Sequence, residues 1–185
     1  MTWRGVQAGD IGFDRGSGLV GWLIRHGSHA GHAHTWIFHE PMVDGRWKTV
    51  EAYPGGVQWN TRSVDDASDR PSLILRLWRN DTERQAILDA SEQMVGAGYD
   101  YWQLIRIIFY ALKITLPRRE STTRFICSAH VAHAVDAARD DIDFSVPKRR
   151  IWPGRLAEDL YRRKWNDAVS EADDAESATW TAATS

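Results

Sequence analysis

The sequence contains a single cysteine, Cys127, among its 185 residues. One cysteine excludes an internal disulfide, and it excludes a zinc site built from several cysteines. A lone cysteine is most often a small buried hydrophobic residue. A chemical role for Cys127 must therefore be argued from the residues around it.

The sequence also lacks an excess of either charge, with 23 basic and 25 acidic residues and a net charge of -2. Proteins that bind nucleic acid normally carry a basic excess, so we expect no nucleic-acid partner. Residues 167–185 hold five acidic residues and no Lys or Arg, which leaves 20 acidic against 23 basic residues, a charge of +3, in residues 1–166. We expect one globular domain over 1–166 and an acidic, disordered tail over 167–185.

Long hydrophobic runs are missing as well. The most apolar stretch, 101–116, contains Arg106 and Lys113 and is shorter than the ~20 residues that span a bilayer. The first residues lack the apolar segment of a signal peptide. These features predict a cytoplasmic protein without stable membrane insertion, with release by lysis or another route as the alternative.

What the sequence does contain is enough apolar surface for a core, with 43% hydrophobic and 11% aromatic residues. Alternating and β-branched segments predict strands in the first half. Helical spacing and an Asn80–Glu83 capping pair predict helices in the second. The expected strands are 11–13, 34–39, 46–53, 57–61 and 73–78, and the expected helices are a short one after Ser17 and then 81–95, 101–116, 127–138 and 154–165. This segregation predicts an α+β fold with a small antiparallel sheet packed on helices.

Cys127 stands at the expected start of a helix. The unpaired N–H groups and the dipole at a helix N-terminus stabilise a thiolate, and a thiol placed there can become a nucleophile near neutral pH. The alternative is a packed core cysteine, and the local sequence does not separate the two.

A thiolate hydrolase also needs a general base, and the sequence offers seven histidines. His34 opens a strand, which can hold an imidazole in a fixed orientation. His130 lies three residues after Cys127 and shares its helix face, but a solvent-facing role is the simpler interpretation for it. The histidines at 26, 29 and 32 fall in a glycine-rich loop and suit a base less well.

Glu51 is the candidate for the group that orients the base. If residues 41–45 form the hairpin loop, simple pairing places His34 near Ala52. A slip of one residue, or a bulge, would place Glu51 beside His34 on the same face. A purely structural carboxylate is the alternative.

Several motifs together resemble a known family. In chain order they are Gly9-Asp10-Ile11, Ser28-His29, His34-Thr35-Trp36-Ile37, 50–57 (VEAYPGGV), 98–101 (GYDY), Phe125-Ile126-Cys127-Ser128 and 151–157 (IWPGRLA). Over about residues 8–160, their order is similar to that in permuted papain-fold cysteine hydrolases, the YiiX-like branch of the NlpC-type peptidase superfamily, related to lecithin retinol acyltransferase. In that branch the catalytic His precedes the catalytic Cys, the reverse of ordinary papain-like enzymes.

The resemblance implies a circularly permuted papain-like fold with Cys127 as nucleophile, His34 as base and Glu51 as the orienting residue. It implies a hydrolase without a cofactor that cleaves an amide bond in a cell-wall or other small peptide through an acyl-enzyme. A bacterial or phage origin would suit such a protein. The alternative on the same fold is a hydrolase or acyltransferase acting on a lipid ester or a thioester.

Three other interpretations are weighed against this one. The dense histidines at 29, 32, 34 and 39 raise the question of zinc, but their spacing is not a standard ligand pattern, so we expect no metal. Ten tryptophans would suit a glycan- or peptide-binding module without catalysis, although core packing explains them more simply. The apolar 101–116 stretch and the basic Arg118-Arg119 and Lys148-Arg149-Arg150 could meet anionic lipid at a membrane surface.

Overall fold

The computed structural model describes residues 5–16, 21–22, 24–25, 31–64, 71–111, 114–117, 121 and 123–164. The tail expected over 167–185 lies outside these residues, as does Ser17 at the start of the expected short helix. Residues 21–22 and 24–25 are helical.

The centre of the fold is a five-stranded antiparallel sheet with the strand order β4-β3-β2-β1-β5. The strands are β1 (Ile11–Asp14), β2 (His34–Pro41), β3 (Trp47–Tyr53), β4 (Gly56–Arg62) and β5 (Leu73–Leu75). The expected antiparallel sheet and the mixed α and β content are confirmed. The expected strand over 73–78 is shorter, because its partner β1 pairs with it only over Ile11–Phe13.

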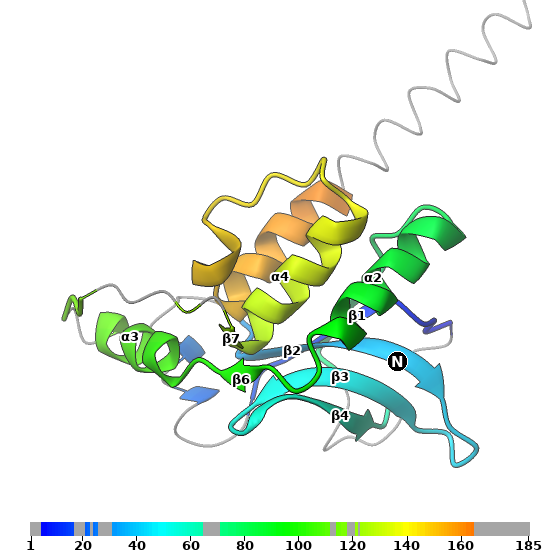
Figure 1. Cartoon of the computed structure of the whole chain (residues 1–185), viewed down its shortest axis with the longest axis horizontal. Helices are drawn as coiled ribbons and strands as arrows, with labels where there is room; N and C mark the ends of the chain where they lie inside the picture. Colours follow the sequence, from blue (N-terminus) through cyan, green and yellow to red (C-terminus); the bar gives the residue numbers. More distant parts are fainter. Residues whose placement is uncertain are drawn as a thin grey trace, which may run out of the picture.

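Helices cover one face of this sheet (Figure 1). They are α2 (Asp81–Gln93), α4 (Cys127–Ala138) and the helical residues 153–164, with α3 (Tyr101–Ala111) to one side and a short 3-10 helix at Lys148–Arg150. The helix expected over 101–116 is wrong in its second part, since residues 114–117 are not helical. A short parallel pair, β6 (Gly98–Tyr99) with β7 (Arg124–Phe125), was not expected from the sequence.

The core forms where apolar side chains of alternate strand residues meet α4. Ile37 joins Val131 and Val135 in the main cluster, while Val50 and Ala52 pack against residues at the start of α4, Cys127 among them. The opposite face of the sheet buries Trp36 and Phe38. Because strand side chains alternate, His34 and Glu51 belong to that second face.

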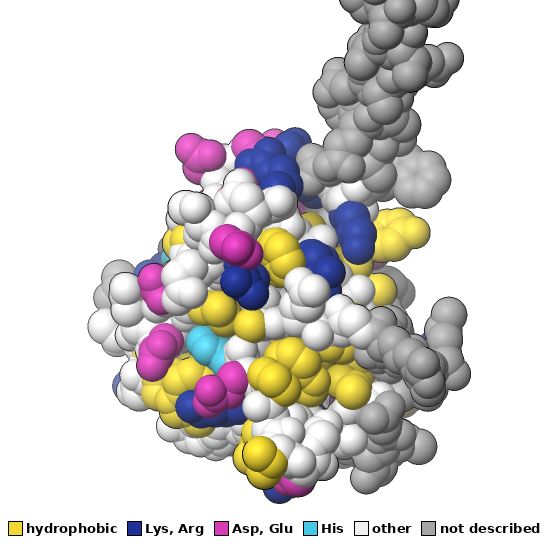
Figure 2. All heavy atoms as spheres, turned by 90° about the vertical axis from the view of Figure 1, so that its right-hand side faces the viewer, with side chains coloured by type: hydrophobic (Ala, Val, Ile, Leu, Met, Phe, Trp, Pro, Cys, Tyr) yellow, Lys and Arg dark blue, Asp and Glu magenta, His cyan; other side chains and the backbone are white. Residues whose placement is uncertain are grey.

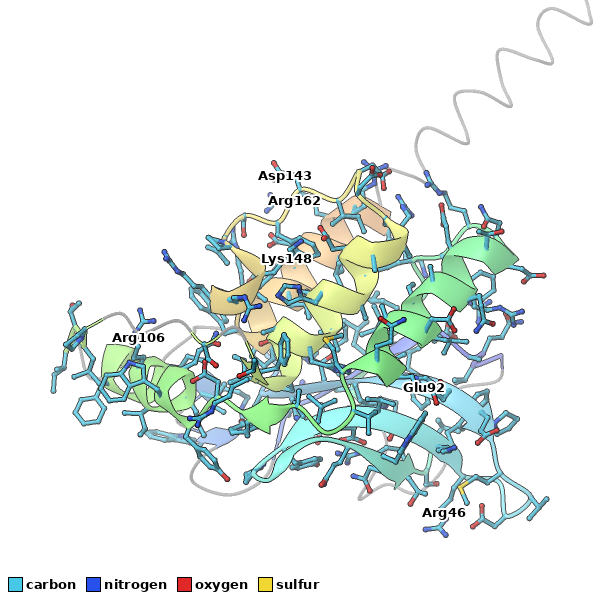
Figure 3. The ribbon with its side chains drawn as sticks, viewed as in Figure 1. Arg46, Glu92, Arg106, Asp143, Lys148 and Arg162 are labelled. Atoms are coloured by element: carbon cyan, nitrogen blue, oxygen red, sulfur yellow. The ribbon has the colours of Figure 1, made fainter. Side chains whose placement is uncertain are left out.

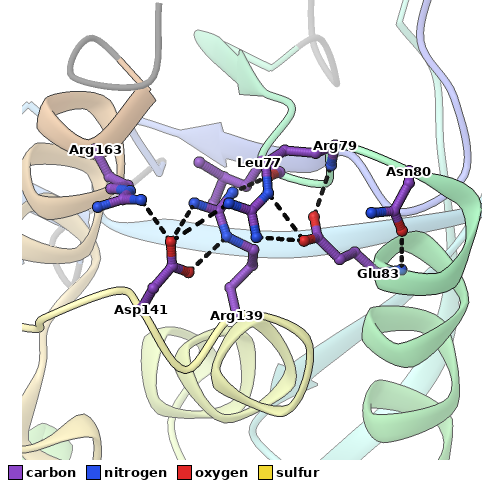
Figure 4. A network of polar contacts seen from close by, with 7 residues as sticks. All are labelled: Leu77, Arg79, Asn80, Glu83, Arg139, Asp141 and Arg163. Carbon is purple, nitrogen blue, oxygen red and sulfur yellow. Dashed lines mark hydrogen bonds and ion pairs between the residues drawn. The ribbon is translucent and has the colours of Figure 1, made fainter. Parts of the chain in front are cut away.

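Polar contacts fix α4 at both of its ends. At its C-terminal end the buried Arg139 donates to the Leu77 carbonyl at 2.6 Å and to Asp141 at 2.7 and 3.0 Å. Arg163 reaches the same carboxylate, and Arg79 extends the network to Glu83 (Figure 4). At the N-terminal end, the Ser128 hydroxyl donates to the Ile151 carbonyl at 2.6 Å. The helix therefore presents its first residue at a defined place beside the sheet.

The surface mixes both charges with apolar groups. On the face shown in Figure 2, basic and acidic side chains are interspersed with hydrophobic patches. Within the described part of the chain, no helix has both the length and the apolar character that crossing a bilayer requires.

Candidate active site

A bulge in β2 sets the register that brings His34 and Glu51 together. Ile37 lies opposite Val50, whereas Glu40 lies opposite Lys48, so the bulge falls at His39. Continued from Ile37, this register places His34 opposite Tyr53 and on the same face as Glu51. The simple pairing of His34 with Ala52 is wrong, and the bulged alternative is confirmed.

Glu51 is a fully buried carboxylate whose oxygens both have partners. The Nε2 of His34 donates to Oε2 at 2.7 Å, and the Thr49 hydroxyl donates to Oε1 at 2.7 Å. Arg62 binds both oxygens, through Nε to Oε1 at 2.9 Å and through its terminal nitrogen to Oε2 at 2.7 Å. This is the bidentate geometry in which a guanidinium holds a carboxylate most firmly.

Aromatic side chains hold the charged groups in position. The Arg62 guanidinium stacks over the Trp36 ring, 4.6 Å from its centroid, and also donates to the Tyr53 hydroxyl. The Tyr53 ring lies 4.6 Å from the His34 ring, centroid to centroid. Contacts therefore run in a closed ring through His34, Glu51, Arg62 and Tyr53.

Cys127 completes the group from the other half of the chain. His34 is the first residue of β2 and Cys127 the first of α4, and the two side chains interact at the end of the sheet. Burial disfavours the imidazolium, but the charge of Cys127, a hydrogen bond with Cys127 and the Glu51 carboxylate together outweigh it and raise the pKa of His34 to about 9. Since Glu51 binds Nε2, the other ring nitrogen, Nδ1, is left for the sulfur.

The same contacts keep Glu51 ionised. Burial alone would raise its pKa, but the hydrogen bonds from Arg62 and then from His34 outweigh burial and lower the pKa of Glu51 to about 2. Because Arg62 and Glu51 are opposite in charge, the pair adds no net charge behind His34.

The start of α4 offers donors next to the sulfur. The residue before the helix, Ile126, makes no side-chain capping hydrogen bond, and the first N–H groups of a helix have no partner within it. Cys127 is 5% exposed and the side chain of His34 13% exposed. The pair therefore lies just beneath the surface, at the helix end whose first amide groups have no partner within the helix.

The other described histidines do not share this site. His130 is fully buried, which contradicts the solvent-facing role expected for it, and burial chiefly lowers its pKa to about 4. Nε2 of His39 lies 2.6 Å from the Ser91 hydroxyl oxygen. Nδ1 of His32 lies 3.1 Å from the Ser72 hydroxyl oxygen. The histidines at 26 and 29 lie outside the described residues. Among the histidines that are described, His34 is the one whose pKa Cys127 affects.

Other expected features have definite positions. No three His, Cys, Asp or Glu side chains cluster as metal ligands would, within the residues that the structure describes. Trp36 is fully buried and Trp22 is 47% exposed. The tryptophans at 47, 59, 78 and 102 are half-buried.

Arg62, Thr49 and Tyr53 belong to the site but were not predicted from the sequence. Thr49 and Tyr53 share a face of β3 with Glu51, because strand side chains alternate, and this alternation is a usable signal. Arg62 is the last residue of β4 and pairs across the sheet with Trp47. Its reach to Glu51 depends on the register of β3 with β4 and is not visible in any local motif.

Comparison with known proteins adds no family to this geometry. No family model matches the chain, and the search of curated proteins gives no match either.

Proposed function

We propose that the protein is a cysteine hydrolase that cleaves an amide bond of a small peptide through a covalent acyl-enzyme. Cys127 is the nucleophile, His34 the general base and acid, and Glu51 the residue that orients His34. The observation that carries the proposal is the contact of Cys127 and His34 at the end of the sheet, with Glu51 bound to the opposite ring nitrogen. The motif order described above supports a circularly permuted papain-like fold as the framework.

The first half of the reaction is acylation. His34 takes the proton of Cys127, and the thiolate attacks the substrate carbonyl carbon. The N–H of Cys127 at the start of α4 stabilises the oxyanion. The imidazolium of His34 then donates its proton to the leaving nitrogen, the C–N bond breaks, and a thioester to Cys127 remains.

Deacylation uses the same groups. His34 takes a proton from water, the resulting hydroxide attacks the thioester carbonyl, and the sulfur leaves as thiolate, which recovers the proton that His34 holds. Glu51 keeps its hydrogen bond to Nε2 throughout, so the ring presents Nδ1 to the sulfur in both steps. A fixed second partner is what sets the tautomer of a catalytic imidazole.

A second candidate activity is acyl transfer from a lipid ester or a thioester, and an exposed apolar helix favours it. Tyr101 and Ile105 of α3 are 51% and 38% exposed, and Ile107 of the same helix packs against the cluster that contains Cys127. Arg106 is the single charged residue of α3 (Figure 3). An apolar helix with one basic residue beside the nucleophile suits a substrate that carries an acyl chain.

Alkylation of the single cysteine tests the proposal without a known substrate. We expect iodoacetamide to label the wild type below pH 7, with intact mass reporting one adduct, and we expect His34→Gln to move that labelling to the pH of an ordinary thiol. Cys127→Ala is the blank. Labelling that begins only near pH 8.5 in the wild type and is unchanged in His34→Gln would contradict the proposal.

The bond cleaved is determined by a matched panel. The wild type is incubated with an acyl group presented as a peptide amide, an ester and a thioester, and the mass of the acylated protein and the release of product are followed. We expect acylation on Cys127 and turnover of the amide. Turnover of the ester and thioester alone would assign the second activity, and retained binding without any adduct would indicate a binding module.

A further inference from the structure

Arg62 is a charged member of the site that takes no part in the proposed reaction steps. Arg62 is a buried guanidinium on an edge strand, and it makes two hydrogen bonds to Glu51, at 2.9 and 2.7 Å. Burying an ion pair carries a large desolvation cost for each ion, and such a pair is seldom the most stable choice for a site. Its presence directly behind His34 calls for a role in the site.

The contacts of Arg62 explain what that role is. Oε2 of Glu51 is shared between Arg62 and His34. Arg62 therefore fixes the oxygen that orients the imidazole, and its charge offsets that of the carboxylate. Trp36 and Tyr53 hold the guanidinium in turn.

We infer that Arg62 is a positioning residue, which clamps the Glu51 carboxylate against His34, cancels its charge, and so sets the pH at which Cys127 becomes reactive. This inference rests on the proposed function of Cys127 and His34. Arg62 itself touches neither the sulfur nor the substrate in this scheme and acts through Glu51.

Three neighbouring ionisable groups do not change charge in the pH range over which Cys127 alkylation is measured. Burial raises the pKa of Tyr53 and of Tyr99, and burial lowers that of His130 to about 4. These three groups are therefore neutral between about pH 5 and 9. Within the part of the chain that the structure describes, the ionisable groups that face the Arg62–Glu51 pair and its partners include His34 on β2, Tyr53 on β3, Tyr99 on β6, and Cys127 and His130 on α4.

Without Arg62, burial raises the pKa of Glu51, and the carboxylate loses the charge that favours the His34 imidazolium. The thiolate then loses its cation, so the onset of Cys127 reactivity moves to higher pH. A neighbouring charge shifts such an equilibrium by one unit or more, so we expect a shift of about one pH unit, or about tenfold slower alkylation below the midpoint.

The test is the iodoacetamide rate as a function of pH in Arg62→Gln, Arg62→Met and Arg62→Lys. Gln and Met should both raise the midpoint by about one unit, and Met keeps the apolar packing on Trp36 if Gln does not fold. Lys keeps the charge, so its midpoint should stay within a few tenths of the wild type. Such rescue is not expected of a purely structural role.

Arg76→Gln is the matched control. Arg76 also binds a carboxylate through two nitrogens, at 2.8 Å each to Asp10, and lies 4.9 Å from the Trp78 ring centroid, but it is not part of the site. Its loss should lower stability and leave the midpoint unchanged. If His34→Gln raises the midpoint while Arg62→Gln and Arg62→Met do not, the role of Arg62 is wrong and the proposed function stands. If the wild type behaves as an ordinary thiol, both fail together.

Discussion

The most constrained residue of the molecule is Glu51, a carboxylate without exposed surface in the middle of a strand. Three side chains occupy its two oxygens, and two of the three are cations or can become cations. An unpaired charge at such a depth would be strongly destabilising. The arrangement makes chemical sense if Glu51 serves to hold the imidazole of His34.

Replacement of Glu51 by Gln tests this role. Gln fills the same space, but it is neutral, and its amide group can present a donor instead of an acceptor to His34. We expect the turnover of whichever model substrate the panel identifies to fall about 10²- to 10³-fold, within the range typical of general acid–base contributions. The measurement is kcat/KM at pH 7.

Glu40→Gln is the control for that variant. Glu40 is on the neighbouring strand β2, bonds to Lys48 at 2.9 Å and has 61% of its side chain exposed. An exposed pair of this kind contributes little, so activity should stay within twofold of the wild type. Equal activity in Glu51→Gln and Glu40→Gln would remove Glu51 from the mechanism.

At this scale the group of His34, Glu51 and Cys127 was predicted from the order of the family-like motifs, with the helix start as local support for Cys127. Local strand pairing offered Glu51 beside His34 only as an alternative register. Arg62 and the burial of His130 could not be predicted in the same way. Both depend on which elements pack together: Arg62 on β4 reaches Glu51 on the neighbouring strand β3, and His130 lies where α4 meets the sheet and α2.

Among the elements, β4 and the segment before β6 make an unusually close contact. The N–H of Val57 donates to the Ala97 carbonyl, and the N–H of Gly96 donates to the Val57 carbonyl, both at 2.8 Å. Gly56 has a φ of +122°, and a Cβ added there would lie 2.4 Å from the Ala97 oxygen. This contact places β6, with Tyr99, beside the start of α4.

Ala substitutions at two adjacent glycines separate strain from clash. Gly55 has a φ of +125°, close to that of Gly56, but its added Cβ would meet nothing nearer than 3.9 Å. Positive φ costs about 1–3 kcal/mol in either variant. We expect Gly56→Ala to lower the free energy of unfolding in urea by at least about 1 kcal/mol more than Gly55→Ala, because a backbone oxygen must move. Equal losses of unfolding free energy in the two variants would show that the backbone around Ala97 moves aside at no cost.

Element boundaries show where sequence patterns stop being sufficient. The helix that begins at Cys127 and ends at Ala138 was predicted with both bounds correct. The short β5 and the bulge at His39 were not fixed by local pattern, since the first depends on the length of a partner strand and the second on a hairpin register. The bulge decides which face of β3 meets His34, so the geometry of the site follows from a feature that the sequence offered only as an alternative.

For the whole molecule, the meeting of β2 and α4 joins the strand-rich first half to the helical second half. His34 and Cys127 are far apart in the chain, so their interaction exists only in the folded state. A group whose pKa differs between the folded and unfolded states makes global stability depend on pH. The proposed site should therefore be detectable in unfolding experiments, independently of catalysis.

The sign of this dependence follows from the raised pKa of His34. Its pKa is about 9 in the fold against 6.5 ordinarily, so its contribution of about 3 kcal/mol is fully present below pH 6.5 and is lost as the pH rises through 9. A thiol of an unfolded chain ionises near pH 8.5, so urea unfolding of the wild type should show this loss above that pH, and His34→Gln should show much less. Cys127→Ala should also flatten the dependence of stability on pH, since Cys127 is the strongest influence that raises this pKa.

His39→Gln is the control, because burial lowers the pKa of His39 to about 4 and the ring is neutral throughout this range. If His34→Gln and Cys127→Ala keep the alkaline loss of the wild type, as His39→Gln should, then His34 is not charged in the folded protein and the ion pair with Cys127 does not form.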